Sequence, residues 1–139
     1  MYQVFVFGTL KEGFPNFNIN KASRVKGAFL TKKRYPLYLI GDRYAPWLVL
    51  DEGNGHQIRG QVFEVDDVVL ADMDELERIN QEDGYRRVEL TVISEESGEE
   101  MTVFVYGKPL EQLHDADIKL ELKGEYKLEH ARLYLSRNP

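Results

Sequence analysis

The sequence of 139 residues contains no cysteine and no long apolar run. Without cysteine, disulfide bonds, thiolate metal sites and a cysteine nucleophile are all excluded. No stretch approaches the ~20 apolar residues that a membrane-spanning helix needs. The apolar start at residues 1–10 has neither the basic region nor the cleavage site of a secretory signal. We therefore expect a protein without membrane association that is located in the reducing cytoplasm.

Positive charge is scarce as well, since 18 Lys and Arg face 24 Asp and Glu and the net charge is −6. Nucleic acids and anionic membranes favour the opposite sign, so neither is expected as a partner. Apolar residues make up 42% of the chain, with seven Phe, eight Tyr and one Trp among the large side chains, which is enough to build a core. The length fits one domain over residues 1–139, with a monomer as the default.

Short apolar runs rich in β-branched and aromatic residues predict a protein made mostly of strands. Residues 2–7 have apolar side chains on both faces, as expected of a central strand buried between two layers. Further strands are predicted at residues 26–32, 36–40, 46–50 and 58–65, and a hairpin at residues 86–94 and 101–106. Residues 115–122 and 127–135 fit either a strand or a helix. The pattern favours an α+β domain with a largely antiparallel, barrel-like sheet.

One segment, residues 66–81, changes to the helical period. Asp66 is suited to cap its N-terminus. The apolar stripe of this helix consists of Val69, Leu70, Met73, Leu76 and Ile79. On a helical wheel Glu77 falls inside the stripe, where a carboxylate that loses hydration is suited to accept and then return a proton near neutral pH. Glu77 is therefore the leading catalytic candidate.

The alternative for Glu77 is an ordinary ion pair at the edge of the stripe. Arg86 and Arg87 are the partners that such a pair would use, and the sequence does not decide between the two interpretations. The other charged residues of the helix are assigned to structural or solvent-exposed places. Asp72 is interpreted as an ordinary ionised residue, and Asp74, Glu75 and Arg78 as a solvated face.

The junction formed by Phe7, Gly8, Thr9 and Leu10 at the end of the first strand is the second candidate feature. A glycine at a strand end lets the backbone approach a ligand closely, and successive N–H groups of such a turn can converge on an anion or a developing oxyanion. An ordinary turn is the simpler interpretation of the same residues. The pattern is neither a Walker A loop nor a dinucleotide fingerprint. Lys11 either adds positive charge at the rim or is solvated.

Metal binding and cofactors are not expected. Three histidines are present, His56, His114 and His130, and they lie far apart without an HExxH or an i, i+4 arrangement. Trp47, Tyr85 and Tyr106 have the size and the polar tip to wall a pocket, although core packing is the simpler role for each.

Several segments, taken in order, resemble the γ-glutamylcyclotransferase superfamily. They are residues 4–16 (VFVFGTLKEGFPN), 35–41, 46–48, 60–66 (GQVFEVD), 73–77 (MDELE) and 84–90 (GYRRVEL). The similarity is greatest to the γ-glutamylamine cyclotransferase and AIG2-like branch, and it extends over most of residues 1–107. The tail with Arg137, Asn138 and Pro139 is also similar to that branch.

The resemblance implies a small mixed, largely antiparallel β-barrel with packed helices. It also implies site residues by position. The family's catalytic glutamate lies on the helix after a GxVxxV strand, which is the position of Glu77 here. The family's substrate loop, Tyr-Gly-Ser/Thr-Leu, is matched by Phe7, Gly8, Thr9 and Leu10, and a pocket tyrosine is matched by Tyr85. Phe7 departs from the family pattern because it keeps the ring but lacks the hydroxyl.

The activity implied by the resemblance is release of 5-oxoproline and a free amine from a γ-glutamylamine such as ε-(γ-glutamyl)-lysine. The α-amine of the substrate attacks its own γ-carbonyl, and Glu77 acts as general acid and base, with no metal or cofactor. The expected partner is thus a small-molecule γ-glutamyl substrate. Two alternatives stay open: a noncatalytic module that binds a small ligand in the same pocket, and a cyclotransferase for γ-glutamyl amino acids or a γ-glutamyl-protected biosynthetic intermediate.

Overall fold

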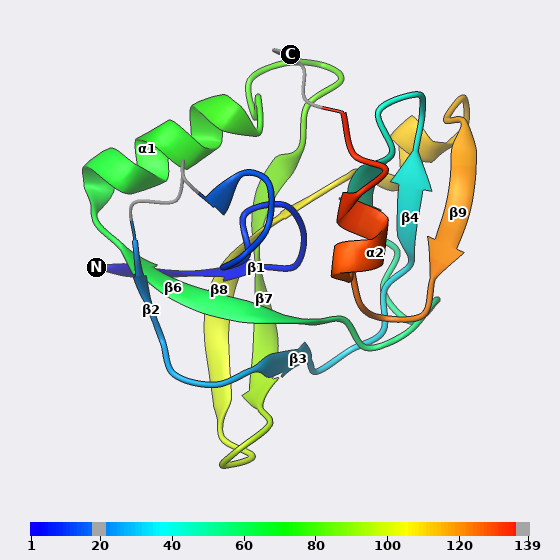
Figure 1. Cartoon of the computed structure of the whole chain (residues 1–139). Coiled ribbons are helices and arrows are strands. Elements are labelled where there is room, and N and C mark those ends of the chain that lie inside the picture. The colour runs from blue at the N-terminus through cyan, green and yellow to red at the C-terminus, as the bar shows by residue number, and fades with distance from the viewer. Residues whose placement is uncertain (18–21, 136–139) are drawn as a thin grey trace.

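A β-barrel forms the body of the molecule in the computed structural model, which describes residues 1–17 and 22–135 (Figure 1). The barrel strands are β1 (Tyr2–Val6), β8 (Glu100–Gly107), β7 (Arg86–Ser94), β3 (Phe29–Thr31) and β6 (Arg59–Val65), in spatial order. Pairing of β6 with β1 closes the barrel, and the short strand β2 (Ser23–Arg24) adds to β6.

The barrel is mixed because one of its strand pairs is parallel. Strand β1 lies between β6 and β8. It pairs antiparallel with β6, where Val4 is opposite Phe63, and parallel with β8, where Val4 is opposite Phe104. The remaining barrel pairs are antiparallel. Val4 and the next two residues of β1 are buried, as the apolar side chains on both faces predicted. The structure thus confirms the predicted α+β class and the mixed, largely antiparallel barrel.

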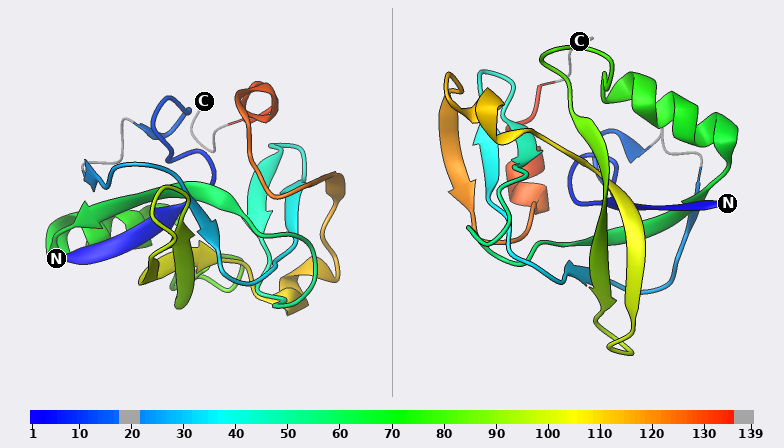
Figure 2. Two further views of the ribbon diagram at one scale, coloured as in Figure 1. Left: turned by 90° about the horizontal axis from the view of Figure 1, so that it is seen from below. Right: turned by 180° about the vertical axis from the view of Figure 1, so that it is seen from behind.

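A second sheet stands beside the barrel. Its strands are β5 (Ala45–Leu48), β4 (Leu37–Ile40) and β9 (Ile118–Leu122), all antiparallel. The short helix α2 (Leu128–Ala131) lies between this sheet and the loop that follows β1 (Figures 1 and 2). The sequence pattern left residues 115–122 and 127–135 open, and the structure forms β9 within the first segment and α2 within the second. A 3₁₀ helix, η2 (Leu110–Leu113), precedes β9.

Helix α1 (Asp67–Leu76) packs against the barrel at the end of β6. It begins as predicted, because the Asp66 side chain accepts a hydrogen bond of 2.9 Å from the amide of Val69. The predicted C-terminal end at residue 81 is wrong. The helix ends at Leu76, and Arg78 has a φ of +55°, which a right-handed helix cannot contain.

The hairpin of β7 and β8 forms where the sequence predicted it, with Leu90 opposite Val103. The glycine of the GxVxxV segment, Gly60, has a packing reason. A Cβ atom at that position would lie 2.4 Å from the carbonyl oxygen of Val6, so only glycine lets β6 approach β1 this closely.

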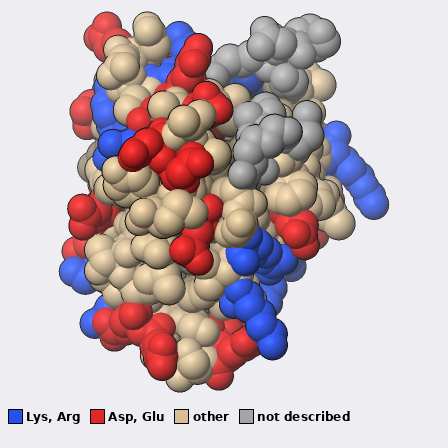
Figure 3. Space-filling view, turned by 90° about the vertical axis from the view of Figure 1, so that its left-hand side faces the viewer, with Lys and Arg blue, Asp and Glu red and all other residues tan. Residues whose placement is uncertain are grey.

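Clusters of acidic side chains are scattered over the face that Figure 3 shows, with Lys and Arg mainly toward its edges. The view is from the side of α1, whose outward positions include Asp67, Asp72 and Glu75. Among the described residues, no helix is long and apolar enough to cross a membrane. Three residues used in the family resemblance, Arg137, Asn138 and Pro139, lie outside the described part of the chain.

Candidate active site

A cavity of about 330 Å³ opens where the end of β1, the end of α1 and the start of β5 come together. All the site residues that the family resemblance implied line it. They are Phe7, Gly8, Thr9, Leu10, Glu77 and Tyr85. These residues come from three separate parts of the chain, so their convergence is a property of the fold rather than of one local motif.

The turn after β1 forms one wall of the cavity. Its amide at Lys11 donates to the carbonyl of Gly8 at 3.1 Å. A Cβ atom at Gly8 would lie 2.9 Å from Cγ of Pro46, so glycine is needed for β5 to pack against the turn. Within the described residues, no recorded hydrogen bond takes the amide of Gly8 or Thr9 as its donor. No residue of that part of the chain therefore competes with a ligand for these two N–H groups.

Asn16 holds this turn in place, which the sequence analysis did not anticipate. Its amide donates to the carbonyl of Thr9 at 2.8 Å, and its side-chain Nδ2 donates to the Thr9 hydroxyl at 2.9 Å. The same Nδ2 also donates to the hydroxyl of Tyr134 at 3.3 Å. A C-terminal residue therefore completes the wall that begins at Gly8.

Glu77 is the residue directly after α1, and its half-buried side chain lines the cavity. Its amide donates to the carbonyl of Met73 at 2.9 Å, and its carbonyl accepts from the amide of Tyr85 at 3.0 Å. Gly84 makes this return of the chain possible, since a Cβ atom there would lie 1.7 Å from the carbonyl oxygen of Arg78. The backbone on both sides of Glu77 is thus fixed.

Both arginines that the sequence offered as ion-pair partners of Glu77 make other contacts. The Arg87 guanidinium donates to Oδ2 of Asp74 at 2.6 Å. Arg86 instead donates to backbone carbonyls, including those of Gln81 and Gly84 at 3.0 and 3.1 Å. Their guanidinium groups are thus held by Asp74 and by the loop after α1.

Asp74 was assigned to a solvated face of the helix, and that prediction is wrong. Its carboxylate accepts a hydrogen bond of 2.6 Å from the hydroxyl of Tyr106 in addition to the bond from Arg87. Burial, followed by the hydrogen bond to Asp74, raises the pKa of the Tyr106 hydroxyl well above its ordinary value. Helical periodicity could not reveal this contact because the partners belong to β7 and β8.

Tyr85 and Tyr106 both line the cavity, while Trp47 packs behind it. The Tyr85 hydroxyl donates to the carbonyl of Pro46 at 2.8 Å, which links the loop after α1 to β5. The Lys108 ammonium lies 4.6 Å from the centre of the Tyr85 ring and 4.3 Å from that of Trp47. These cation–π contacts fix the Tyr85 ring from the side of β8.

Lys11 was predicted at the rim of the site or in solvent, and it is in neither place. It is 5% exposed, does not line the main cavity, and its ammonium donates to the carbonyl of Tyr126. The ammonium also lies 4.2 Å from the centre of the Phe14 ring. Burial lowers the pKa of Lys11 from 10.5 to about 8.

No group of three His, Asp or Glu side chains that could hold a metal ion occurs in residues 1–17 and 22–135. The site as described therefore consists of a carboxylate, a turn with backbone amides and several aromatic walls. This arrangement can bind a small polar molecule and move one of its protons.

The sequence model of the family described as "Gamma-glutamyl cyclotransferase, AIG2-like" matches residues 4–128. The chain belongs to this family. It is 36% identical over 108 residues to a gamma-glutamylaminecyclotransferase of Bos taurus, covering 74% of this chain and 63% of that protein. It is 34% identical over 82 residues to the Mus musculus protein of the same name, covering 55% of each. The matches thus span little more than half of these curated relatives.

A solved structure gives a more extensive match. The crystal structure of an AIG2-like protein from Mus musculus superimposes with a TM-score of 0.83 at 30% identity, covering 100% of this chain and 98% of that one. An uncharacterised protein from Pyrococcus horikoshii also superimposes, with a TM-score of 0.66 at 26% identity, covering 95% of this chain and 98% of that one. The predicted resemblance to the AIG2-like branch of the cyclotransferases is therefore confirmed.

Proposed function

We propose that this AIG2-like chain is a γ-glutamylcyclotransferase that acts on γ-glutamylamines such as ε-(γ-glutamyl)-lysine and releases 5-oxoproline and a free amine. The observation that carries the proposal is that Glu77 and the turn from Gly8 to Leu10 line one cavity. The names of the bovine and murine relatives support the same reaction class.

The reaction requires no nucleophile from the protein. The α-amine of the substrate attacks its own γ-carbonyl carbon, and the new C–N bond closes a five-membered ring. The bond between that carbon and the leaving nitrogen then breaks, and the nitrogen departs with a proton as an amine. A carboxylate takes one proton from the α-ammonium and gives it to the leaving nitrogen, which departs as an amine. The second proton, released when the ring nitrogen becomes an amide N–H, is taken up by that amine, which then carries the positive charge.

Each wall of the cavity has a role in this proposal. The amides of Gly8 and Thr9 hold the γ-glutamyl head group and oppose negative charge that develops on the γ-carbonyl oxygen. Glu77 transfers the proton. The rings of Phe7 and Tyr85 complete the walls that keep the substrate folded, and Phe7 does so without the hydroxyl of the family's tyrosine.

The magnitudes favour such a site. Well-oriented intramolecular reactions reach effective molarities on the order of 10⁵ to 10⁸ M, and a positioned base adds roughly 10² to 10⁴ in rate. The cavity needs only to bind the open-chain substrate in a folded conformation, with the α-nitrogen near the γ-carbonyl carbon. It must also place one carboxylate beside the α-nitrogen. The fixed backbone on both sides of Glu77 suits that task.

The proposal is tested by incubating the purified protein with a panel of γ-glutamyl compounds and measuring 5-oxoproline. The panel contains ε-(γ-glutamyl)-lysine, γ-glutamyl amino acids and γ-glutamyl alkylamines. We expect 5-oxoproline and the free amine in equal amounts from at least the first compound. If no compound gives 5-oxoproline, the enzymatic proposal is wrong and a noncatalytic module that binds a small ligand is favoured.

A further inference from the structure

Arg43 is a charged residue of the cavity that the proposed reaction does not use. It lies in the turn between β4 and β5, is half-buried and lines the cavity. Its guanidinium carbon lies 6.0 Å from the centre of the Tyr134 ring. Within residues 1–17 and 22–135, no carboxylate is recorded in an ion pair with it. Because a half-buried charge without a counter-ion costs free energy, a bound anion would stabilise it.

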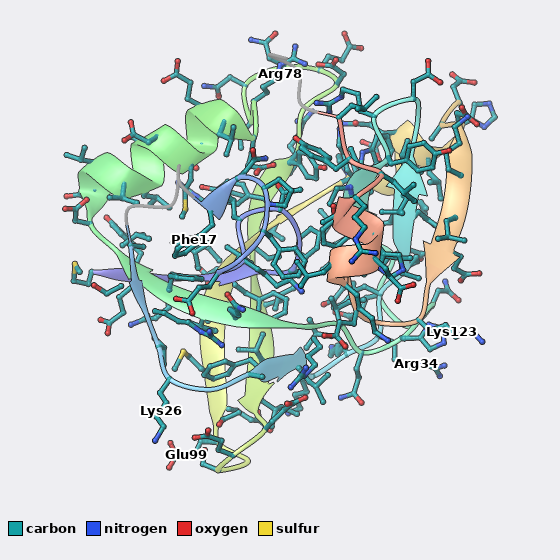
Figure 4. All side chains as sticks on the ribbon, in the orientation of Figure 1. Phe17, Lys26, Arg34, Arg78, Glu99 and Lys123 are labelled. Carbon is teal, nitrogen blue, oxygen red and sulfur yellow. The ribbon has the colours of Figure 1, made fainter. Side chains whose placement is uncertain are left out.

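Within the described part of the chain, and unlike Arg43, the other arginine that lines the cavity, Arg78, forms an ion pair with a carboxylate. Its guanidinium forms an ion pair of 3.2 Å with Asp83. Figure 4 labels it beyond the C-terminal end of α1. The carboxylates that line the cavity, Glu75 and Glu77, come from the end of α1 as well. Among residues 1–17 and 22–135, the β4–β5 turn therefore supplies a positive charge of the cavity that forms no ion pair with a carboxylate.

The position of Arg43 is fixed relative to the turn after β1. Its carbonyl accepts a hydrogen bond of 2.9 Å from the amide of Leu135. The adjacent Tyr134 accepts from Asn16, which in turn binds Thr9. Arg43 and the proposed head-group site are thus connected through Tyr134 and Asn16, and both line the same cavity.

The two ends of the cavity come from opposite parts of the fold. Helix α1 and strand β4 lie on opposite sides of the loop after β1 in every view (Figures 1 and 2). Glu77 follows α1, Arg43 precedes β5, and both residues line the cavity. A substrate whose α-amine is beside Glu77 and whose γ-carbonyl is at the Gly8 turn has its remaining half free to extend toward Arg43.

We propose that Arg43 binds a carboxylate on the leaving half of the substrate, which makes the preferred leaving group an amino acid rather than a simple amine or a polyamine. The inference rests on the proposed function and specifies its substrate class. ε-(γ-glutamyl)-lysine fits because the lysine retains its α-carboxylate. Arg43 acts through a planar guanidinium that can hold a carboxylate by two parallel hydrogen bonds.

The test compares ε-(γ-glutamyl)-lysine with γ-glutamyl-cadaverine, which differs only by loss of that carboxylate. The kcat/KM ratio of this pair is measured for the wild type and for Arg43→Gln, Arg43→Glu and Arg78→Gln. Because hydrogen bonds to a charged group are strong, we expect the wild type to prefer the lysine compound by about ten- to a hundredfold. Arg43→Gln should abolish the preference, Arg43→Glu should reverse it, and Arg78→Gln should retain it.

Two results would overturn the proposal. An unchanged preference in Arg43→Gln would show that Arg43 does not contact the leaving half. An equal fall for both compounds would assign Arg43 to the head group's own carboxylate, which the two compounds share. Circular dichroism and thermal unfolding establish that each variant is folded.

Binding of the two compounds, measured by calorimetry, tests the role of Arg43 independently of whether the protein catalyses the proposed reaction. If neither compound yields 5-oxoproline, the proposed function fails, but the Kd values of the same pair still decide the role of Arg43. Tighter binding of the lysine compound that is lost in Arg43→Gln supports a carboxylate site. Equal binding of both compounds, or no binding of either, rejects it.

Discussion

The hydroxyl of Tyr106 donates a hydrogen bond of 2.6 Å to Asp74, three residues before Glu77 in the chain. Asp74 belongs to α1 and Tyr106 to β8, so this bond attaches the last part of the helix to the barrel wall. Arg87 holds the second carboxylate oxygen from β7. The end of α1, and with it the backbone of Glu77, is positioned by the barrel as well as by helical hydrogen bonds.

Replacing Tyr106 by Phe removes this attachment without removing the ring. We expect the free energy of unfolding to fall by about 1.5–3 kcal/mol, because the lost hydrogen bond is to a charged group. We also expect kcat to fall more than KM rises, since Glu77 loses its fixed position while the head-group turn stays intact. Chemical denaturation and steady-state kinetics measure the two effects. Tyr38→Phe, at a tyrosine outside the cavity, is the matched control. A loss of stability with unchanged kcat would limit the Tyr106–Asp74 bond to a structural role.

Gly8→Ala tests the close contact between the turn and β5. The new Cβ would lie 2.9 Å from Cγ of Pro46, so the turn must shift. Such overpacking costs about 1–3 kcal/mol of stability, and displacement of the amides should lower kcat/KM. Gly13→Ala is the control, because its Cβ would meet no atom within 4 Å and its φ of +87° affects stability only. An unchanged kcat/KM in Gly8→Ala would remove the turn from the substrate site.

Lys11 gives the protein a defined pH dependence of stability. Its pKa is lowered from 10.5 to about 8 in the folded state. Between these two pH values the unfolded chain binds more protons at this position than the folded chain, so the free energy of unfolding contributed by Lys11 increases with pH. Below pH 8 both states are protonated and the contribution no longer changes.

The measurement compares the wild type with Lys11→Met at several pH values, because other titrating groups cancel in the difference. The wild type should gain stability relative to the variant as the pH rises from 8 to 10.5, by about 1–3 kcal/mol in total. Urea unfolding at constant ionic strength gives the values. A constant difference over this range would mean that Lys11 keeps its ordinary pKa in the folded protein.

Features that depend on local pattern were predictable from the sequence. The buried strand β1, the cap of α1 at Asp66 and the β7–β8 hairpin all follow from side-chain alternation, helical spacing and turn residues. The end of α1 was not predictable in this way. The apolar period continues to Ile79, but the positive φ of Arg78 and the close approach of Gly84 bend the chain back toward Tyr85.

The candidate site was partly predictable, and the reason lies in the origin of its residues. The helical stripe and the family resemblance each indicate Glu77, and the strand-ending glycine indicates Gly8. Asn16, Arg43 and Tyr134 were missed because they meet only through contacts between distant segments. No local spacing relates these three residues, so only the fold brings them to one wall.

The most direct test of the account is the rate of 5-oxoproline release by Glu77→Gln, measured beside Glu75→Gln as a carboxylate of the same helix end. The amide of glutamine keeps the size of the side chain but cannot take up the α-ammonium proton. We expect folded Glu77→Gln to lose about 10²- to 10⁴-fold in kcat, the contribution of a positioned general base, while Glu75→Gln retains most of the activity. Release of 5-oxoproline by folded Glu77→Gln at the wild-type rate would contradict the assignment.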